Sequence, residues 1–432
     1  MSPINVGIIG LGTVGGGAFR ILERNAARIQ SRVGAPIVLT RVATRTPQRA
    51  LDAGLDAAIV SNDVEALLND DSIHIVAELI GGIEPARTYI LRALESGKSV
   101  VTANKELIAK HGAEIRAAAE KAGVDVLFEG SVGAGIPLIK SLRESLAANE
   151  ISEVMGILNG TTNFILTKMT QEGADFAETL AEAQQLGYAE ADPTADVDGF
   201  DALYKLAIIA GICFDTPVDI NDIYREGIRK VSARDIDYAT ELGFVIKLIA
   251  LGRRDDDGRL ELRVHPTLLP KAHPLANVND SFNAVWVRGD AVGDVMFYGR
   301  GAGDLPTGSA IVADIIEAAR NRARGVRTPD HSPDEKAEIQ PFDNAQTRFC
   351  VRMQVGDLPG TIARIAGVFG DEGVSIESIV QRHRERDSAG GFAEIFWMTH
   401  HTTQSAMNAS LAQFEQLDVI REVSSVLRVE GE

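Results

Sequence analysis

The 432-residue sequence is poor in cysteine: it contains only Cys213 and Cys350. Two cysteines exclude a disulfide framework and a zinc site built from several thiolates. Each lies in an apolar stretch, so we expect two buried free thiols in a reduced, cytoplasmic protein. The sequence also lacks a run of about 18 apolar residues and a basic N-terminal segment followed by an apolar one. These absences argue against a membrane span and a secretion signal.

Positive charge is also in deficit. Lysine and arginine number 43 against 61 aspartates and glutamates, which gives a formal net charge of −18. This balance argues against nucleic acid and anionic membrane surfaces as the main partners. The length predicts two to four domains, and a hydrophobic content of 45% predicts that they are globular and have large cores.

A strand, a glycine-rich turn and a helix follow one another at the N-terminus. Residues 4–9 predict a short buried strand, and residues 14–29 have a helical pattern. Between them, Gly10 permits a tight turn, Gly12 lets the backbone approach a pyrophosphate, and Gly15 lets the helix pack closely on the strand. This order predicts a dinucleotide site at the helix N-terminus. The alternative is a glycine-rich turn without a ligand.

The second predicted strand, residues 36–43, ends in Thr44 and Arg45. Enzymes that use NAD usually place an aspartate or glutamate near this strand end to bind the ribose hydroxyls. No acidic residue stands there in this sequence. Arg45 offers a guanidinium to a 2′-phosphate, which favours NADP(H), with NAD(H) as a second cofactor. The alternative is that Arg45 is a solvated loop residue.

Strands and helices continue to alternate up to about residue 128. We expect strands at residues 72–79, 98–102 and 124–128, with helices at residues 84–95 and 105–122. Right-handed crossovers between these strands give a doubly wound parallel sheet whose ligands bind at the strands' carboxyl ends. The residues expected on that edge are Gly81, Gly82, Thr102, Asn104 and Lys105. Lys105 is either a functional residue that reaches nicotinamide and substrate or a surface lysine at a helix start.

A helix that is apolar on every side carries three charged residues. Asp198, Asp201 and Lys205 are spaced to share one face of the helix that continues to about residue 214. Charged residues are rarely buried without a partner. Either Asp201 and Lys205 form a structural ion pair, or Lys205 faces a small polar substrate in a cleft. An acidic loop at residues 187–196 precedes this helix and suits a substrate with an ammonium group, although a solvated acidic loop is the alternative.

The middle of the chain differs from its beginning. Expected strands at residues 154–158, 244–251, 260–264, 284–288 and 295–298 indicate an α+β domain with a largely antiparallel sheet. A glycine-rich turn at residues 129–137 offers one carboxylate and several carbonyls to a hard cation. The alternative for this segment is a plain tight turn.

The C-terminal part predicts a small domain of its own. A proline-containing, charged stretch reads as a linker, and the strands and helices that follow have the order βαββαβ of a ferredoxin-like fold. Asp357 and Gly360 stand at its first strand-to-helix turn. The expected domains are residues 1–150 with a return of about 300–322, a substrate and dimerisation domain at 151–322, a linker at 323–346, and the terminal domain at 347–432.

Several of these segments together resemble homoserine dehydrogenase. They are the turn at residues 10–15, Thr102-Ala103-Asn104-Lys105, Gly133-Ala134-Gly135-Ile136-Pro137, Asn159-Gly160-Thr161-Thr162-Asn163, and Glu190-Ala191-Asp192-Pro193 followed by Asp201 and Lys205. Residues 348–430 resemble an ACT domain, an amino-acid-sensing module. The resemblance implies a Rossmann-type domain, an α+β domain and an ACT domain. It implies interconversion of L-aspartate 4-semialdehyde and L-homoserine by a monofunctional enzyme, within threonine, methionine and isoleucine biosynthesis.

The resemblance also implies roles for particular residues. Lys205 is the expected acid/base, and Lys105 the residue that contacts nicotinamide and substrate. The residues expected to bind the cofactor are Gly10, Gly12, Thr13, Val14, Gly15, Arg45, Thr102, Ala103, Lys105 and Gly303. Those expected to bind the substrate are Gly187, Glu190, Asp192, Asp196 and Asp201. Glu129 and the carbonyls of Val132, Ala134 and Ile136 are expected to hold a sodium ion. Many members of the family have glycine at the position of Ala134, and a carbonyl ligand survives that change.

Two other classes of protein stay open at this stage. A 2-hydroxy-acid dehydrogenase with an ACT domain would need a catalytic histidine paired with a carboxylate, and no such pair stands out. A non-catalytic sensor that binds NADP would not need both Lys105 and Lys205. For the enzyme, we expect L-threonine as effector, bound near Asp357 and Gly360, and a homodimer or homotetramer.

Overall fold

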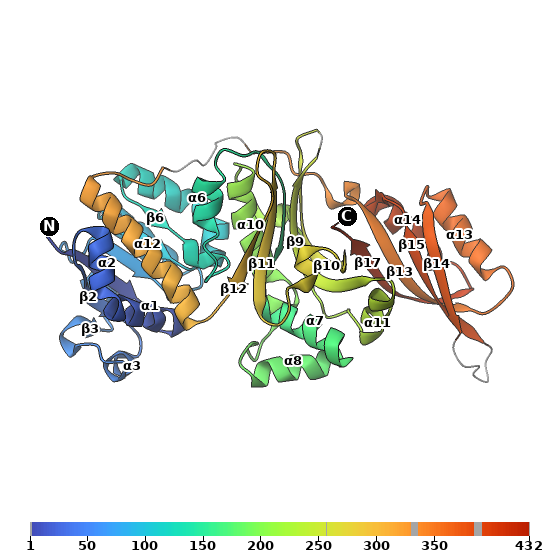
Figure 1. The fold of residues 1–432 in the computed structure, drawn as a ribbon, viewed down its shortest axis with the longest axis horizontal. Helices are drawn as coiled ribbons and strands as arrows, with labels where there is room; N and C mark the ends of the chain where they lie inside the picture. Colours follow the sequence, from blue (N-terminus) through green and yellow to red (C-terminus); the bar gives the residue numbers. More distant parts are fainter. Residues whose placement is uncertain (1, 256, 330–335, 384–390, 432) are drawn as a thin grey trace. The chain divides into compact units, whose positions relative to one another are not determined.

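The computed structural model describes residues 2–255, 257–329, 336–383 and 391–431. The chain forms two compact units (Figure 1). The first unit contains Met1–Val154, Asp201–Asn221 and Phe282–Ala337, and the second contains Met155–Phe200, Asp222–Ser281 and Glu338–Glu432. The chain first passes from one to the other within β7 (Ile151–Ile157). Among the described residues, no helix has the length and apolar character needed to cross a membrane.

The first unit contains a six-stranded parallel sheet of order β3-β2-β1-β4-β5-β6. This confirms the expected doubly wound sheet, whose order reverses between β1 and β4. Open α/β sheets bind their ligands at such a reversal. The strands are β1 (Ile4–Ile9), β2 (Ile37–Ala43), β3 (Val60–Ser61), β4 (Ile75–Glu78), β5 (Ser99–Thr102) and β6 (Val126–Leu127). Their helices are α1 (Thr13–Arg24), α2 (Ala26–Val33), α3 (Pro47–Asp52), α4 (Val64–Leu68), α5 (Ala86–Glu95), α6 (Lys105–Ala122) and α12 (Asp304–Arg324).

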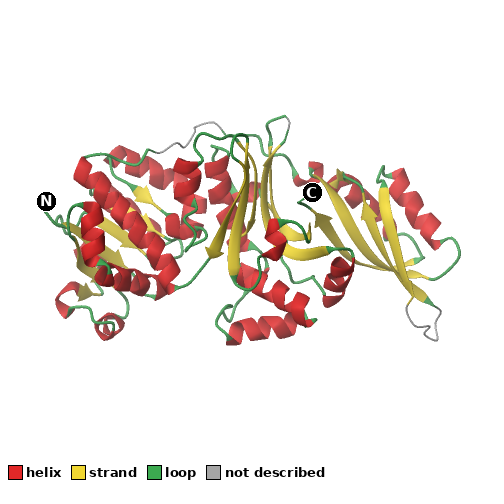
Figure 2. Cartoon of the chain, in the orientation of Figure 1, coloured by secondary structure: helices red, strands yellow, loops and turns green. Residues whose placement is uncertain are grey.

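Helices α1 and α12 cross at two glycines. A Cβ on Gly17 would lie 2.0 Å from the carbonyl oxygen of Asp304, and a Cβ on Gly308 would lie 2.6 Å from the carbonyl carbon of Gly17. Only glycine permits backbones to approach this closely. The single helix predicted for residues 14–29 was wrong, because the chain turns at Asn25 and α2 begins at Ala26. Figure 2 shows the helices and strands of both units.

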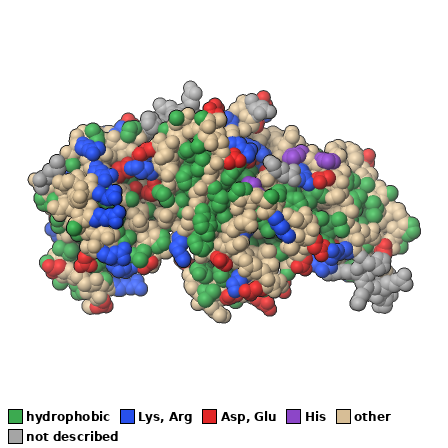
Figure 3. All heavy atoms as spheres, in the orientation of Figure 1, with side chains coloured by type: hydrophobic (Ala, Val, Ile, Leu, Met, Phe, Trp, Pro, Cys, Tyr) green, Lys and Arg blue, Asp and Glu red, His purple; other side chains and the backbone are tan. Residues whose placement is uncertain are grey.

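The first unit also contains α10 (Phe200–Cys213) and a hairpin of β11 (Phe282–Gly289) and β12 (Gly293–Arg300). Most of α10 is buried, as its apolar sequence predicted. The helix begins at Phe200, so the prediction that Asp198 shares its face was wrong. Tyr298 on β12 is 55% exposed, and hydrophobic side chains gather over these strands (Figure 3).

The C-terminal part of the second unit has the predicted order βαββαβ. Its sheet has the order β17-β13-β15-β14, and Phe349, Phe369, Trp397 and Phe414 form the centre of its core. The elements are β13 (Gln346–Gly356), α13 (Thr361–Asp371), β14 (Ile376–His383), β15 (Phe392–Thr399), β16 (Thr402–Thr403), α14 (Gln404–Phe414) and β17 (Ile420–Val429). Residues 330–335 of the predicted linker lie outside the described residues.

The sheet of the second unit does not end at β17. β17 pairs in parallel with β10 (Leu260–Pro270), with Thr267 opposite Arg428, and β10 pairs antiparallel with β9 (Phe244–Arg254). The sheet of the C-terminal part therefore continues into β10 and β9. The remaining elements of the unit are α7 (Gly160–Glu172), α8 (Phe176–Gln185), α9 (Thr194–Val197), β8 (Tyr224–Arg225) and α11 (Ala233–Glu241).

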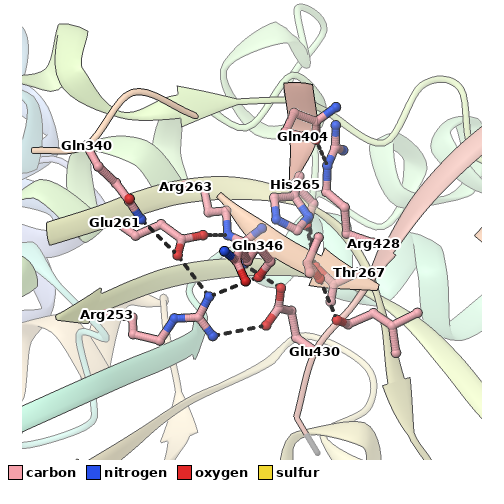
Figure 4. Close-up of polar contacts among 12 residues, drawn as sticks. Arg253, Glu261, Arg263, His265, Thr267, Gln340, Gln346, Gln404, Arg428 and Glu430 are labelled. Atoms are coloured by element: carbon pink, nitrogen blue, oxygen red, sulfur yellow. Dashed lines mark hydrogen bonds and ion pairs between the residues drawn. The ribbon is translucent and has the colours of Figure 1, made fainter. Parts of the chain in front are cut away.

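Buried charges join β10 to the end of the chain (Figure 4). Arg263 is completely buried, and its guanidinium lies 2.8 Å from the Glu261 carboxylate and 2.5 Å from the Glu430 carboxylate. Arg253 also pairs with Glu261, at 2.8 Å. The positive charges of two arginines thus offset the negative charges of two glutamates at the point where β17 ends.

Candidate active site

One buried carboxylate lies between the two lysines that the sequence singled out. Asp201 Oδ2 lies 2.7 Å from Nζ of Lys205, one turn further along α10. Asp201 Oδ1 lies 2.6 Å from Nζ of Lys105, the first residue of α6. Asp201 and Lys205 are 4% and 7% exposed, whereas the side chain of Lys105 is 42% exposed. The sequence suggested the contact with Lys205 but gave no sign of the contact with Lys105.

This arrangement combines two ammonium donors with a carboxylate acceptor. Burial alone disfavours a charged lysine, and the shared carboxylate favours it. Ammonium groups held in a partly dry site can donate a proton to an oxygen that gains negative charge, and can stabilise that charge. The geometry therefore suits the reduction of a carbonyl group or the reverse oxidation of an alcohol.

A chain of hydrogen bonds holds the start of α6 in place. The side-chain oxygen of Asn104 caps the helix by accepting from the backbone N–H of Leu107, and the backbone N–H of Asn104 donates to the Thr102 hydroxyl. The Thr102 hydroxyl donates at 2.7 Å to Glu78, which is completely buried at the end of β4. Glu78 also accepts the backbone N–H groups of residues 80 and 81. The sequence analysis missed Glu78, although a carboxylate at the end of an apolar strand was a usable signal.

A second set of contacts ties α6 to α10, and the sequence analysis missed it too. Glu106, the residue after Lys105, accepts from Nζ of Lys110 at 2.6 Å and from the Tyr204 hydroxyl at 3.5 Å. Lys110 Nζ lies 5.1 Å from the centre of the Tyr204 ring. The hydrogen bond to Glu106 raises the pKa of Lys110. Because Tyr204 is next to Lys205 in the chain, these contacts help to set the separation of the two lysines.

The glycine-rich turn has room for a phosphate group. Gly10 has a φ of +97°, and a Cβ there would lie 2.8 Å from the carbonyl oxygen of Leu79. A Cβ on Gly15 would lie 2.3 Å from the carbonyl oxygen of Gly10, so the helix starts close to the strand. A Cβ on Gly12, by contrast, would meet no atom within 4 Å. The open side of Gly12 and the N–H groups at the start of α1, which begins with Thr13 and Val14, suit a pyrophosphate.

The other expected cofactor residues lie in different parts of the first unit. Arg45 is exposed in the loop after β2. Thr102 is buried at the end of β5, with Ala103 directly after it. Gly303 precedes α12 with a φ of +122°, and the close approach of Asp304 to α1 brings this helix start beside the glycine-rich segment.

The glycine-rich turn after β6 is tightly constrained. Glu129 is 8% exposed, and its carboxylate accepts the backbone N–H groups of Leu138, Ile139 and Lys140 at 2.6–2.9 Å. Burial nevertheless raises the pKa of Glu129. Ala134 has a φ of +36°, a left-handed conformation that follows a similar one at Gly133. The three residues expected to offer carbonyls are all buried: Val132, Ala134 and Ile136.

The acidic loop belongs to the second unit. Gly187 has a φ of +79°, and Glu190 is exposed. Asp192 is also exposed, and its hydrogen bonds with Thr194 lower its pKa. The Asp196 carboxylate accepts a hydrogen bond from the Asn159 amide at 2.7 Å. The loop therefore presents carboxylates of different exposure just before α10.

Asp357 and Gly360 lie at the turn between β13 and α13, as expected. Asp357 is exposed, and Gly360 has a φ of +91° at the N-cap of α13. Leu358 between them is 65% exposed. A glycine at this position lets the helix begin directly after the tight turn.

Comparisons with known proteins agree with this arrangement. Family models for homoserine dehydrogenase, its NAD-binding domain and the ACT domain match residues 137–316, 10–129 and 351–418. A homoserine dehydrogenase of Synechocystis is 46% identical, with 99% of each chain covered. The crystal structure of one from Thiobacillus denitrificans superposes with a TM-score of 0.93 at 43% identity, covering 99% of this chain and 98% of that one. A hyperthermophilic archaeal homoserine dehydrogenase in complex with NADPH has a TM-score of 0.63 at 29% identity, and covers 73% of this chain and 97% of its own.

The matches cover both catalytic domains and the C-terminal domain. The similarity to the Synechocystis relative covers 99% of both chains, so the resemblance seen in the motifs extends over almost the whole chain. The chain belongs to the homoserine dehydrogenase family, whose members are NAD(P)-dependent oxidoreductases that act on a CH–OH group.

Proposed function

We propose that Lys205 is the acid/base of the interconversion of L-aspartate 4-semialdehyde and L-homoserine. The observation that carries this proposal is the single Asp201 carboxylate that pairs with both Lys205 and Lys105. NADPH, when bound, supplies the hydride for the aldehyde carbon. The carbonyl oxygen then gains negative charge, and Lys205 donates the proton that makes it a hydroxyl. Lys105, the more exposed of the two, orients the substrate and the nicotinamide.

The acidic loop is proposed to bind the substrate's ammonium group. Glu190, Asp192 and Asp196 lie within seven residues of one another, and Gly187 offers backbone groups. A carboxylate is negatively charged at neutral pH and attracts a cation, and the hydrogen bonds with Thr194 lower the pKa of Asp192 further. Carboxylates placed around a small site bind an ammonium group through charge-assisted hydrogen bonds.

NADP(H) is the proposed preferred cofactor, with NAD(H) tolerated. Arg45 is exposed in the loop after β2, and this strand end lacks the acidic residue that would bind the ribose hydroxyls of NAD(H). Arg45→Asp should lower kcat/KM for NADP+ much more than for NAD+, because it removes the 2′-phosphate partner and adds a repelling charge. Steady-state kinetics with both cofactors and saturating L-homoserine measure this ratio.

Arg49 provides the matched control for this prediction. It is an exposed arginine on α3, four residues further along the chain. Arg49→Asp changes the net charge equally, so general electrostatics would shift the cofactor ratio equally in both variants. An unchanged ratio in Arg45→Asp would contradict the role of this residue.

Sodium is the proposed structural cation, held by Glu129 and the carbonyls of Val132, Ala134 and Ile136. A carboxylate has about four lone-pair sites, so the three N–H donors on Glu129 leave room for a cation. A cation would also offset the burial of this charge. We expect a higher Tm in NaCl than in choline chloride at equal ionic strength, and a smaller difference in Glu129→Gln. Equal Tm values in the two salts would contradict the site.

L-Threonine is the proposed inhibitor, bound at the turn that contains Asp357 and Gly360. Coupling free energies of about 1–3 kcal/mol correspond to inhibition of about 5- to 150-fold. Asp357→Ala should weaken this inhibition, measured as the threonine concentration for half-maximal loss of activity. Asp371→Ala, at the exposed last residue of α13, should leave it unchanged. Absence of any threonine effect on the wild type would contradict the regulatory proposal.

A further inference from the structure

Residues 224–229 lie between the acidic loop and the C-terminal strand, and they bond to both. On the side of the loop, the Arg225 guanidinium donates to the carbonyl oxygen of Asp198 and lies 3.6 Å from the centre of the Phe200 ring. Arg229 makes a two-pronged ion pair with the Asp198 carboxylate. These contacts hold the turn that leads directly into Asp201.

The backbone of the same segment is pressed against this turn. A Cβ on Gly227 would lie 2.3 Å from the carbonyl oxygen of Val197, so only glycine fits there. The next residue, Ile228, donates its N–H to that carbonyl at 2.8 Å. Backbone and side-chain contacts together join the turn at residues 197–200 to residues 224–229, so the two must move together.

On its other side, the segment is held by Arg428 of β17. The Arg428 guanidinium donates to the Glu226 carboxylate at 2.7 Å, and its centre lies 5.3 Å from the centre of the Tyr224 ring. Arg428 is 5% exposed, and Gln404 of α14 accepts from its Nε at 3.0 Å. Residues 224 and 226 therefore face the C-terminal strand, while Arg225 between them faces the loop.

An open pocket of about 560 Å³ borders the segment and is lined by Tyr224, Glu226 and Lys230 and by residues of α14 and β17. Where side chains leave such a space unfilled, directional polar contacts fix the position of the segment. Tyr224 also stacks on Phe342, with ring centres 3.5 Å apart.

We infer that residues 224–229 are a connector through which β17 positions the substrate loop, with Arg225 and Arg428 as positioning residues. The inference rests on the proposed substrate role of the acidic loop. It means that the C-terminal domain contributes to substrate binding even without an effector. Loss of either arginine releases the turn before Asp201 and misplaces the groups that bind the substrate.

Kinetics of the full-length enzyme test this inference. Arg225→Met and Arg428→Met should each raise KM for L-homoserine and lower kcat/KM about 10-fold, with KM for NADP+ unchanged. Both arginines act on one turn. The kcat/KM of the double variant should therefore be no more than about twofold below that of the more impaired single variant. Arg421→Met is the matched control, since Arg421 is an exposed residue of β17 whose guanidinium lies over Phe392.

Two further readouts separate positioning from plain stability. Arg428→Lys keeps the charge but lacks the planar guanidinium, so its KM for L-homoserine should fall between those of the wild type and Arg428→Met. This variant replaces Arg428→Met in the test if Arg428→Met does not fold. Lower Tm values with an unchanged KM for L-homoserine would overturn the inference, as would losses that multiply in the double variant. Turnover of L-homoserine by the wild type tests the proposed function. The ratios of kcat/KM between the variants and the wild type test the connector.

Discussion

Lys205→Ala should lower kcat by about 10²- to 10⁴-fold, the usual contribution of a positioned general acid or base. The substitution removes the buried ammonium that lies 2.7 Å from Asp201, while the ion pair of that carboxylate with Lys105 remains. KM for NADPH should change little, because the expected pyrophosphate site is at residues 10–15, in the turn before α1 and its first residues. Steady-state kinetics in both directions measure these values.

A purely structural Lys205 predicts a different outcome. Breaking a buried ion pair would then cost about 3–5 kcal/mol of stability, while the molecules that remain folded would turn over normally. Tm and kcat are therefore measured on the same preparation. Lys168→Ala is the control, since Lys168 pairs with Glu172 at the surface one turn along its helix. Near-normal turnover together with a large drop in Tm would refute the acid/base assignment.

Arg263→Met should destabilise the second unit by about 3–5 kcal/mol, because it leaves buried carboxylates without their partner. Arg263 is completely buried, and the side chains of Glu261 and Glu430 are 6% and 7% exposed. Among the described residues, Arg253 would remain as an ion-pair partner of both carboxylates, so one positive charge would face two negative charges. Urea denaturation followed by fluorescence measures the change, and in a Trp286→Phe background the signal comes from Trp397, which is buried in this unit.

Arg259→Met is the matched control on the same hairpin. Its ion pairs with Asp255 and Asp257 are partly to largely exposed, and pairs at the surface contribute about 0–1 kcal/mol. Equal denaturation midpoints for Arg263→Met and the wild type would show that the buried cluster adds no stability. The cluster also explains why removal of the whole C-terminal domain is a poor test of regulation, since β10 would lose both its neighbouring strand and the partner of Arg263.

Local sequence determined the N-terminal sheet and the C-terminal fold. The turn at residues 10–15, directly after an apolar strand, can form only where glycines accept close backbone contacts, so its structure follows from the chain itself. The alternation of strands and helices fixes a parallel sheet because crossovers have one hand. In the same way, hydrophobic periodicity placed α14 at Gln404–Phe414.

Local sequence also singled out Lys205, because a charged residue in an apolar helix is unusual. It misjudged Asp198, whose spacing from Asp201 suggested the same helix face. The helix begins at Phe200, and the carboxylate of Asp198 pairs with Arg229 instead. A helix boundary depends on tertiary contacts of the turn before it, which spacing alone does not contain.

Only the tertiary structure decided which distant residues meet. The contact of Lys105 with Asp201 joins residues 96 positions apart along the chain and depends on how α6 packs against α10. The close crossing of α1 and α12 at Gly17 and Gly308 likewise has no local signature. The pairing of β17 with β10, which extends the C-terminal sheet into the rest of the second unit, also has no local signature. Side-chain periodicity reports which face of an element is buried, but the partner that covers this face is chosen by the packing of the whole chain.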